Sequence, residues 1–296
     1  MTAPIAAIIL AAGKGTRMKS DTHKVLHPIA GRPMLLHLID SVKALGAERE
    51  VVVVGAGREQ VEAAVHPLGV ETAEQAEQLG TGHAVRMAEG ALAGFQGDVL
   101  ILYGDVPLVT TETMCRMLDA LHGDGGPSVV VLGFRPVDPG AYGRVIVGPD
   151  GRLDKIVEYK DATPEERAVT LCNSGLMAVR SVDLFRLLAQ LGNDNAAGEF
   201  YLPDIVMLAA ADGRPEEWRF ERSARTAALA SCSCSRPAAE AGHASFAGVR
   251  LAEAGGVERE RPTPWRTSSR APRIRPGAHS GRRRRRGSRS RGRARR

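Results

Sequence analysis

The 296-residue sequence has few cysteines, few aromatic residues and no long apolar segment. Its 4 cysteines are too scattered for a disulfide framework, and Cys232 and Cys234 lack a second pair at zinc-ligand spacing. No segment approaches the roughly 18 apolar residues that a membrane span requires. The apolar start of the chain has no basic residue before it, which argues against a signal peptide. We therefore expect a reduced, cytoplasmic protein without a membrane partner.

Lysine is absent from the C-terminal part of the chain. From Arg219 to Arg296 the sequence holds 21 Arg, no Lys and 5 Glu, a net charge of +16, whereas residues 1–218 carry −10. The formal net charge of +6 averages two unlike parts and says nothing about the partners of the first. We predict a folded domain over 1–218 and an irregular, disordered, Arg-rich low-complexity tail over 219–296.

Two hypotheses account for the Arg-rich tail. One is a basic arm that binds nucleic acid or anionic surfaces. The other is a shifted reading frame in a GC-rich gene, because Arg, Ala, Gly, Pro and Ser are the residues that GC-rich codons give out of frame. The absence of lysine favours the second hypothesis, since basic arms usually mix both cations. A nucleic-acid partner is expected only if the tail is genuine.

A glycine-rich basic loop follows the first apolar run. Residues 6–10 predict a buried strand, and Gly13 and Gly15 then allow a tight turn whose N–H groups can approach a ligand. Arg17 and Lys24 add positive charge, in forms suited to bidentate and to point contacts with phosphate. The pattern indicates a phosphate-binding loop. A glycine-rich turn with surface lysines is the simpler alternative.

Two familiar phosphate-binding motifs do not fit this loop. A Walker loop needs Gly, four residues and then Gly-Lys-Ser or Gly-Lys-Thr, and the sequence contains no such run. A dinucleotide-binding fingerprint needs a third glycine where Met18 stands. The loop therefore indicates another class of nucleotide-binding protein.

Apolar runs alternate with helical spacing along the chain, which is typical of an α/β fold with a mostly parallel sheet. Two further segments, 142–147 and 156–163, bracket a Pro-Asp-Gly turn and predict a β insertion over the edge of the site. Besides 6–10, strands are predicted at 51–54, 99–102 and 128–134, and helices at 33–45, 58–65, 84–92, 181–191 and 205–211.

Polar residues follow several of the predicted strands. The turn at 80–82 precedes a helical pattern and can present N–H groups to a ligand, or its threonine can simply cap the helix. Asp105 follows a strand at its carboxyl end, where open α/β sheets bind ligands, and a carboxylate there suits Mg²⁺. Capping of a helix near Thr110 is the alternative for Asp105. For Glu158 the alternative is an ion pair with Lys160.

Four segments together resemble the sugar-1-phosphate nucleotidyltransferases. They are Leu-Ala-Ala-Gly-Lys-Gly-Thr-Arg-Met from residue 10, Gln-Ala-Glu-Gln-Leu-Gly-Thr-Gly-His-Ala from 75, Tyr-Gly-Asp from 103 and Asn-Ser-Gly from 173. The second segment is similar to that of the N-acetylglucosamine-1-phosphate uridylyltransferases, the first half of a bifunctional enzyme whose second half is a glucosamine-1-phosphate acetyltransferase. The resemblance runs from about Ile5 to about Arg214 and implies a Rossmann-like nucleotidyltransferase fold.

The resemblance implies transfer of UMP from UTP to N-acetylglucosamine 1-phosphate, giving UDP-N-acetylglucosamine and pyrophosphate. This product would serve the synthesis of cell-wall, peptidoglycan and lipopolysaccharide precursors. Mg²⁺ is the implied cofactor, Asp105 its ligand, and Arg17 and Lys24 the catalytic residues. The implied substrate-binding residues are Leu10, Ala11, Ala12, Gly13, Lys24, Gln75, Gly80, Thr81, Tyr103, Gly104, Asp105, Gly143, Glu158 and Asn173.

The sequence departs from the family pattern at three points. His23 stands where many relatives have proline before the lysine. After residue 214 neither the family's Val-x-Gly-Val-Asn-x-Arg segment, whose Asn is a second Mg²⁺ ligand, nor its acetyltransferase β-helix is found. We therefore expect impaired uridylyltransferase activity and leave the oligomeric state open. The alternatives are a nucleotidyltransferase for another sugar phosphate and a non-catalytic protein that binds UDP-sugar or nucleic acid.

Overall fold

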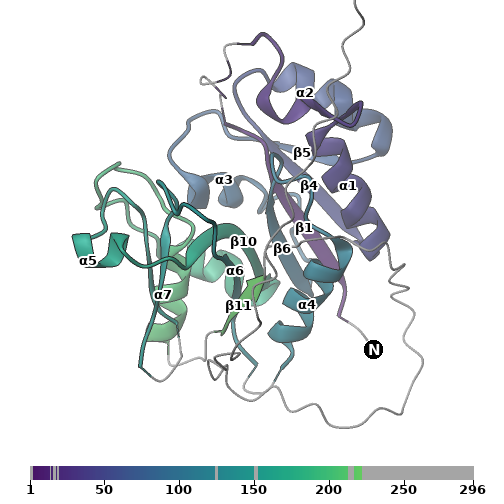
Figure 1. Cartoon of the computed structure of the whole chain (residues 1–296). Coiled ribbons are helices and arrows are strands. Elements are labelled where there is room, and N and C mark those ends of the chain that lie inside the picture. Colours follow the sequence, from purple (N-terminus) through teal and green to yellow (C-terminus); the bar gives the residue numbers. More distant parts are fainter. Residues whose placement is uncertain are drawn as a thin grey trace, which may run out of the picture. The chain divides into compact units, whose positions relative to one another are not determined.

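The structure, a computed structural model, describes residues 3–13, 15, 18, 20–123, 126–149, 153–212 and 217–221. Within these ranges the main sheet has nine strands in the order β11-β7-β10-β6-β1-β4-β5, with β8 beside β10 and β9 beside β8 (Figure 1). The strands are β1 (Ile5–Leu10), β4 (Arg49–Val54), β5 (Glu71–Glu74), β6 (Asp98–Tyr103), β7 (Val129–Phe134), β8 (Arg144–Val147), β9 (Leu153–Val157), β10 (Cys172–Arg180) and β11 (Glu217–Glu221). A separate hairpin joins β2 (Pro28–Ile29) to β3 (Arg32–Pro33).

The mostly parallel sheet that the sequence predicts is confirmed. Strand β1 pairs in parallel with β4 and β6, β4 pairs in parallel with β5, and β11 pairs in parallel with β7. The exceptions are β10, which runs antiparallel to its long neighbours β6 and β7, and the antiparallel pairs that β8 forms with β10 and β9. Because β8 pairs with the start of β10, the β8–β9 hairpin extends the sheet beyond the carboxyl end of β6.

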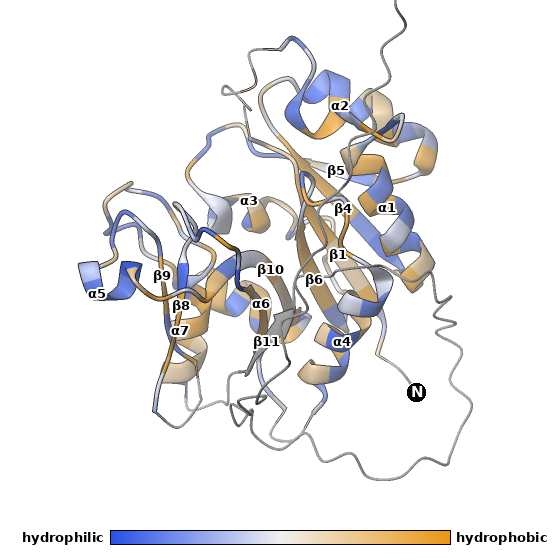
Figure 2. Ribbon diagram, in the orientation of Figure 1, coloured by the Kyte–Doolittle hydropathy of each residue, from blue (hydrophilic) through white to orange (hydrophobic). Residues whose placement is uncertain are grey.

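Helices cover both faces of the sheet (Figure 1). Successive residues of β1 point to opposite faces, so Ala6, Ile8 and Leu10 join one apolar cluster and Ala7 and Ile9 the other. The central strands are therefore mostly apolar beyond their first residues, as Figure 2 shows. One face carries α1 (Met34–Leu45), α2 (Arg58–Val65) and α4 (Thr111–Leu121), and the other carries α3 (Thr81–Met87), α6 (Ser181–Leu188) and α7 (Asp204–Ala211).

Short helices complete the described chain. The 3-10 helices are η2 (Lys24–Leu26) and η3 (His66–Leu68), and α5 (Pro164–Arg167) lies after the hairpin. Thr163 and Glu166 form a reciprocal capping box at the start of α5. Among the described residues, no helix is both long and apolar enough to cross a membrane.

Several predicted boundaries shift in the structure. Helix α3 begins at Thr81 and ends at Met87, whereas the apolar spacing predicted 84–92. The second strand of the insertion ends at Val157, because Glu158 opens a turn whose carbonyl accepts from the N–H groups of Asp161 and Ala162. Strand β11 extends to Glu221 and so crosses the predicted domain boundary at 218. The predictions for 222–296 lie outside the described residues.

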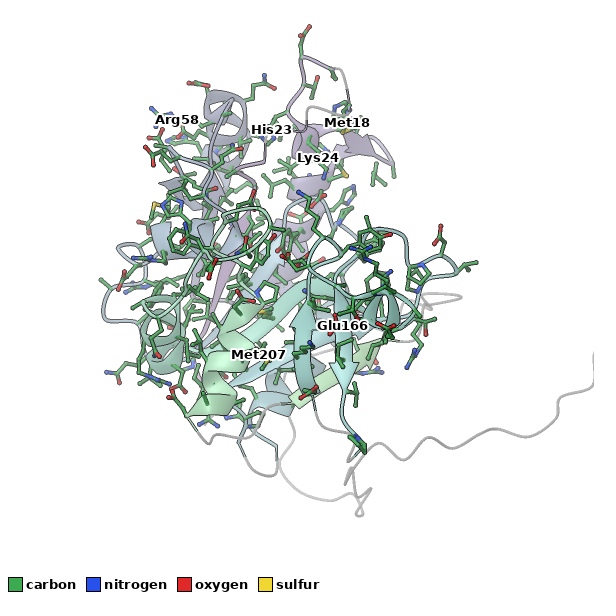
Figure 3. All side chains as sticks on the ribbon, turned by 90° about the vertical axis from the view of Figure 1, so that its left-hand side faces the viewer. Met18, His23, Lys24, Arg58, Glu166 and Met207 are labelled. Atoms are coloured by element: carbon green, nitrogen blue, oxygen red, sulfur yellow. The ribbon has the colours of Figure 1, made fainter. Side chains whose placement is uncertain are left out.

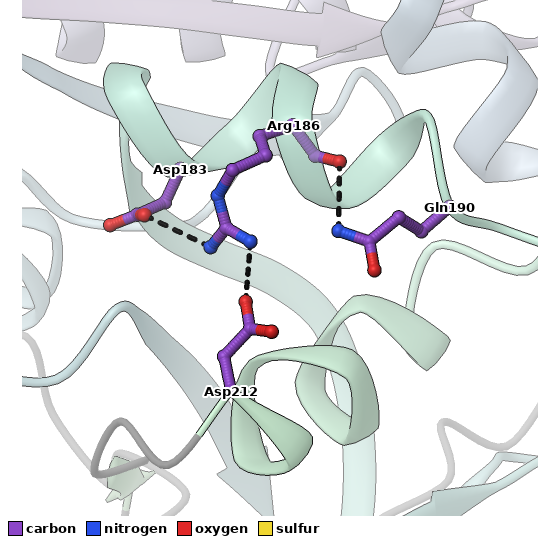
Figure 4. Close-up of polar contacts among 4 residues, drawn as sticks. All are labelled: Asp183, Arg186, Gln190 and Asp212. Atoms are coloured by element: carbon purple, nitrogen blue, oxygen red, sulfur yellow. Dashed lines mark hydrogen bonds and ion pairs between the residues drawn. The ribbon is translucent and has the colours of Figure 1, made fainter.

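An arginine joins the last two described helices. In Figure 4 the Arg186 guanidinium on α6 lies between Asp183 and Asp212. It donates to Asp183 at 3.2 Å, and its own carbonyl accepts from Gln190 at 3.2 Å. The hydrogen bonds to the two carboxylates raise the pKa of Arg186. The contact fixes the end of α7 against α6.

Candidate active site

The phosphate-loop prediction involves the end of β1 and the residues that follow it. The N–H of Ala11 donates to Val53 on β4 at 2.8 Å, and the carbonyl of Leu10 accepts from Gly104 at 2.9 Å. Leu10, Ala11 and Ala12 are buried, so the chain leaves the sheet between the ends of β4 and β6. Gly13 is exposed, and a Cβ there would meet nothing within 4 Å. Open space at this position suits close approach of a ligand to the backbone.

Lys24 and Asp105, two of the predicted chemical groups, form an ion pair. Lys24 opens η2, and Asp105 follows the end of β6, so the loop after β1 and the carboxyl end of β6 meet here. Figure 3 shows Lys24 beside His23 at this end of the sheet. Gly15 has φ +57, and a Cβ on it would lie 2.7 Å from the Cβ of Lys24. Glycine at position 15 therefore lets the backbone pass close to the Lys24 side chain. Arg17 lies outside the described residues.

Gln75 holds the turn at Gly80 and Thr81, which the family resemblance assigns to contact with the uracil ring and which we call the uracil-side turn. Its side chain is buried, and Nε2 donates to the carbonyl of Gly80 at 3.0 Å and lies 3.1 Å from His83 Nδ1. Gly80 has φ +110, and a Cβ there would lie 2.6 Å from the carbonyl oxygen of Phe200. Gln75 and Gly80 thus hold the turn that presents the first residues of α3.

Thr81 joins this turn to a distant segment. Its hydroxyl accepts from the N–H of Leu202 at 3.0 Å, and the N–H of Gly82 donates to Phe200 at 2.8 Å. The alternative of a threonine N-cap is wrong, because the N-cap position of α3 is Gly80 and Thr81 is the first helical residue. The threonine instead fixes residues 200–202 beside the turn.

Tyr103 is the residue on which the separate segments converge. Burial raises the pKa of Tyr103, and the charges of Glu158 and Asp105 raise it further, while a hydrogen bond with Thr81 acts in the opposite direction. Its ring occupies space that only glycine leaves free, since a Cβ on Gly175 would lie 2.5 Å from Cε2. Tyr103 therefore lies within reach of the uracil-side turn, of the Lys24–Asp105 pair and of the insertion.

The helix-capping alternative for Asp105 is also wrong. The N-cap of α4 is Thr110, whose hydroxyl accepts from the N–H of Thr113 at 3.1 Å. Asp105 lies in a turn closed by a hydrogen bond from Val106 to the carbonyl of Tyr103 at 2.9 Å. Gly104 is buried in this turn, where a Cβ would lie 3.2 Å from Val25. The turn aims the carboxylate at Lys24 instead of at a helix.

The three residues that the family resemblance assigns to the sugar lie at one level, next to the β9–β8–β10 ladder. Arg144 pairs with Val157 and with Cys172, so the preceding level contains Gly143, Glu158 and Asn173. The N–H of Asn173 donates to the carbonyl of Gly143 at 2.9 Å, and a Cβ on Gly143 would lie 3.2 Å from Glu158 Oε1. We call these three residues the Gly143 rung.

Asn173 is held by the irregular start of β10. Its Oδ1 accepts from the N–H of Gly175 at 2.9 Å, and the Ser174 hydroxyl donates to the carbonyl of Leu132 at 2.7 Å. The register of β10 against β7 shifts between Asn173 and Met177. This bulge keeps the carboxamide in place and, through Gly175, makes room for Tyr103.

Several carboxylates surround the Gly143 rung. Burial raises the pKa of Glu158, and the charges of Asp204, Asp161 and Glu199 raise it further. Burial also raises the pKa of Asp204, with Asp161 as the second cause. Asp161 accepts from the N–H of Ala196 at 2.9 Å, which ties the insertion to the segment before α7. A carboxyl group with a raised pKa is well suited to hydrogen bonding with neutral hydroxyl groups.

The chemistry of the site fits a hydrated or substrate-shared cation better than a protein cage. The described ranges contain no group of three or more His, Cys, Asp or Glu residues that could hold a metal ion. Asp105 supplies a hard oxygen ligand beside an open loop. Mg²⁺ is typically bound by one or two carboxylates together with phosphate oxygens and water. Asp105 therefore fits that ion in the presence of a polyphosphate.

Some residues that build the site were not among the predicted site residues, although Gln78 lies inside the motif that begins at Gln75. Gln78 Nε2 donates to the carbonyl of Ala12 at 2.6 Å and so ties the uracil-side segment to the phosphate loop. Gln60 on α2 accepts from the N–H of His23 at 2.9 Å and donates to the carbonyl of Asp21 at 2.9 Å. Both glutamines act on backbone groups far away in the chain, which no local pattern reveals.

The chain matches a family model and several curated proteins. Residues 7–201 match the MobA-like NTP transferase domain. The chain is 70% identical over 210 residues to the bifunctional protein GlmU of Rhizorhabdus wittichii, covering 71% of this chain and 46% of the relative. It is 63% identical over 214 residues to the protein of that name from Novosphingobium aromaticivorans, covering 72% of this chain and 47% of the relative. For the protein from Sphingopyxis alaskensis the identity is 65% over 214 residues, with coverage of 72% and 47%.

These matches confirm the resemblance that the motifs indicated. The chain spans about half the length of the curated relatives it matches. The family model covers the site described above except for Leu202 and Asp204, which lie just beyond residue 201.

Proposed function

The chain belongs to the MobA-like NTP transferase domain family, and we propose that it transfers UMP from UTP to N-acetylglucosamine 1-phosphate. The products would be UDP-N-acetylglucosamine and pyrophosphate. The proposal extends to the 14 substrate-binding positions named above, to Mg²⁺ as the cofactor and to Arg17 and Lys24 as the catalytic residues.

The observation that carries the proposal is the surroundings of Tyr103. Tyr103 ends β6 two residues before Asp105, and its ring packs against Gly175, two residues after Asn173. The charges of Glu158 and Asp105 raise its pKa, and a hydrogen bond with Thr81 lowers it. Segments separated along the chain thus supply a phosphate-side carboxylate, a sugar-side carboxylate and a nucleobase-side hydroxyl around one ring. A nucleotidyltransferase needs these three functions next to one another, because the nucleotide and the sugar phosphate must meet at a single phosphorus atom.

The proposed reaction requires no protein base. A phosphate oxygen of the sugar phosphate, already anionic, attacks the α-phosphorus of UTP, a new P–O bond forms, and the bond to the leaving pyrophosphate breaks. Positioning and neutralisation of charge then account for the catalysis. Lys24 supplies a mobile ammonium donor at the place where the two phosphates meet, and it exchanges its contact with Asp105 for phosphate oxygens.

Asp105 is the proposed metal ligand. Asp105 would hold Mg²⁺, which would supply positive charge against the negative charge of the phosphate groups. The Asp105 carboxylate holds its place at the end of β6 through the turn at Gly104, which positions it before any ligand binds. The family's second ligand, an asparagine, is not found after residue 214. Loss of one preorganised contact costs about 2.7–4 kcal/mol in comparable sites, so we expect a slowed reaction.

The Gly143 rung is the proposed binding site for the sugar. An amide and a carboxyl group with a raised pKa can hydrogen-bond to sugar hydroxyls and to an N-acetyl group. Gly143 leaves the Glu158 carboxyl group unobstructed, since a Cβ there would lie 3.4 Å from both Cδ and Oε2. The Gly143 rung thus offers polar atoms to a ligand, because Gly143 has no side chain that would obstruct the Glu158 carboxyl group.

A substrate panel tests this proposal. Pyrophosphate release is measured with UTP, CTP, GTP and dTTP, each combined with N-acetylglucosamine 1-phosphate, glucose 1-phosphate or mannose 1-phosphate. The expected result is the highest kcat/KM for UTP with N-acetylglucosamine 1-phosphate. A higher kcat/KM for another pair would replace the proposed substrates, and binding of UDP-N-acetylglucosamine without turnover of any pair would replace catalysis with binding.

A further inference from the structure

A buried arginine lies beside the Gly143 rung and has no part in the proposed reaction. Arg144 opens β8 and is only 2% exposed. Its partners in the ladder are Val157 and Cys172, one level away from the rung. Because successive residues of a strand point to opposite faces, its side chain leaves β8 on the face away from the rung. A substrate held at the rung therefore does not meet Arg144 directly.

The Arg144 guanidinium holds the loop before β8 in place through hydrogen bonds to its backbone carbonyls. Nη1 donates to the carbonyl of Tyr142 and, at 3.4 Å, to that of Pro139, and Nη2 donates to the carbonyl of Gly140 at 3.0 Å. These acceptors precede Gly143 by one to four residues. A planar fork with fixed donors thereby sets the path of the chain into the rung.

The Arg144 side chain also contacts α5 and the ring of Tyr159, the residue that follows Glu158. Nε of Arg144 donates to the carbonyl of Arg167 on α5 at 3.3 Å. The Tyr159 ring lies 5.5 Å from the Arg144 guanidinium and 4.7 Å from that of Arg167. Arg167 in turn donates to the carbonyl of Tyr159 at 3.1 Å. Two cations on one ring hold Tyr159, and with it the backbone of Glu158.

We propose that Arg144 is a positioning residue that holds Gly143 and Glu158 at the spacing the sugar phosphate requires. The inference rests on the proposed function of the Gly143 rung. Gly143 directly precedes Arg144 at the start of β8, and Glu158 directly precedes its contact residue Tyr159 in the turn after β9. One buried side chain thus controls the distance between the two strands at the level where the sugar binds. Among the described residues, no hydrogen bond of the Arg144 guanidinium goes to the nucleotide side, the loop after β1 and the turn at Gly80.

The test compares Arg144→Lys with Arg135→Lys in steady-state pyrophosphate release. Lysine keeps the charge at 144 but replaces the fork with a single point of donation. Arg135 is an exposed arginine nearby that donates to the Thr170 hydroxyl at 2.6 Å, and it serves as the matched control. Arg144→Lys should raise KM for N-acetylglucosamine 1-phosphate by about tenfold, the lower end of the effect of removing an orienting partner. KM for UTP should stay within about twofold, and Arg135→Lys should leave both constants unchanged.

Two further variants keep the test decisive if Arg144→Lys folds poorly. Tyr159→Phe retains the ring between the two guanidinium groups and should behave as wild type. Tyr159→Leu removes the ring and should raise KM for the sugar phosphate without changing KM for UTP. Equal changes of both KM values in Arg144→Lys and Tyr159→Leu would show a general structural role and overturn the proposal. An unchanged KM for the sugar phosphate would overturn it as well.

Calorimetric titration of the wild-type chain separates this inference from the proposed function. Wild type should bind both UTP and UDP-N-acetylglucosamine, and Arg144→Lys should weaken only the second by about tenfold. Wild type that binds UTP but no sugar nucleotide would overturn the proposed sugar site, and the positioning role with it. Wild type that binds both ligands, together with an Arg144→Lys variant that also binds both normally, would overturn the positioning role alone.

Discussion

At the scale of single residues, the site is built from side chains whose partners lie far away in sequence. Lys24 meets Asp105, Gln78 meets Ala12 and Thr81 meets Leu202. The glycines follow the same logic, because Gly15, Gly80 and Gly175 each leave room for one particular neighbour. Roles at the site therefore depend on contacts that a single substitution can remove.

Replacement of Lys24 tests the phosphate side of the site. Lys24→Ala should lower kcat/KM for pyrophosphate release by about 10²–10³-fold, because an ammonium donor that stabilises transition-state charge is lost. The thermal unfolding temperature should barely change, since partly exposed ion pairs contribute only about 0–1 kcal/mol. The control is Lys43→Ala on α1, which removes a hydrogen bond to the Leu68 carbonyl of η3. A Lys24→Ala variant within about threefold of wild-type kcat/KM would exclude Lys24 from catalysis.

Glu158 should limit stability at neutral pH. Its pKa is raised above the usual 4.5 in the folded protein, so its contribution to stability is complete below pH 4.5 and is lost as pH rises through the folded pKa. Glu158→Gln should therefore raise the unfolding temperature at pH 7–8 by a few degrees, since about 1 kcal/mol corresponds to ~2–4 °C in a domain of this size. The gain should shrink towards zero as pH falls to 4.5.

Glu166 provides the control with the opposite sign. The hydrogen bond from Lys155 lowers the pKa of Glu166, so its contribution is present above its usual pKa and lost as pH falls through the folded value. Glu166→Gln should lower the unfolding temperature at pH 7 and converge with wild type in acid. Calorimetric scans across pH measure both variants. A Glu158→Gln variant that is less stable than wild type at pH 7–8 would contradict the burial argument.

The sequence predicted residue types and their approximate places, but it could not predict their partners. The predicted site residues that the structure describes all lie around the candidate site, at positions 10–13, 24, 75, 80–81, 103–105, 143, 158 and 173. Arg17 lies outside the described residues. The roles of Gln60, Gln78 and Arg144 were not predicted, although Gln78 lies inside a motif, because their side chains bond to backbone carbonyls and amides. Such contacts leave no periodicity and no charge pattern.

At the scale of elements, the ends of strands and the turns after them carry the chemistry. Helix α2 was predicted with its observed bounds because its apolar residues and the preceding Gly57 mark both ends. Helix α3 was misplaced because its first turn, Thr81-Gly82-His83, has no helical apolar pattern and is fixed instead by Phe200 and Leu202. Strand β9 ends early for a similar reason, since the Glu158 carbonyl closes a turn.

Replacement of Gly80 tests how strongly the turn before α3 is constrained. Gly80→Ala should lower the free energy of unfolding by about 2–3 kcal/mol or more, because φ +110 is strained for alanine and its Cβ would lie 2.6 Å from the Phe200 carbonyl oxygen. Gly90→Ala is the matched control, since a Cβ there meets nothing within 4 Å. Urea denaturation measures both. Equal stability of the two variants would mean that the contact with Phe200 does not constrain the turn.

At the scale of the whole molecule, a mostly parallel sheet supports the candidate site, and the β8–β9 insertion contributes to the proposed sugar-binding site. The α/β class and the parallel order follow from continuous apolar runs such as Val51–Val54, which only a sheet covered on both faces accommodates. The antiparallel β10 could not be predicted, because a run that is buried on both faces does not encode its direction. The domain boundary at 218 stays a prediction.

Truncation tests where the folded unit ends. Strand β11 pairs with β7 from Glu217 to Glu221, so a chain that ends at Glu221 should unfold at the same temperature as the full chain. A chain that ends at Asp212 lacks β11 and should unfold several degrees lower, because β7 then becomes an unpaired edge. The tail hypotheses separate in the same experiment. Salt-sensitive binding to DNA or RNA that is lost on truncation at Glu221 would favour a genuine basic arm.

The most direct test of the account is pyrophosphate release by the full chain with UTP, N-acetylglucosamine 1-phosphate and Mg²⁺, with Asp105→Asn as the comparison. The account predicts release that requires both substrates and falls by at least about 10²-fold in Asp105→Asn, since the metal ligand and the partner of Lys24 are then lost. Release that needs only one substrate, or that is equal in the two proteins, would contradict the convergence of phosphate, sugar and nucleobase groups at this site.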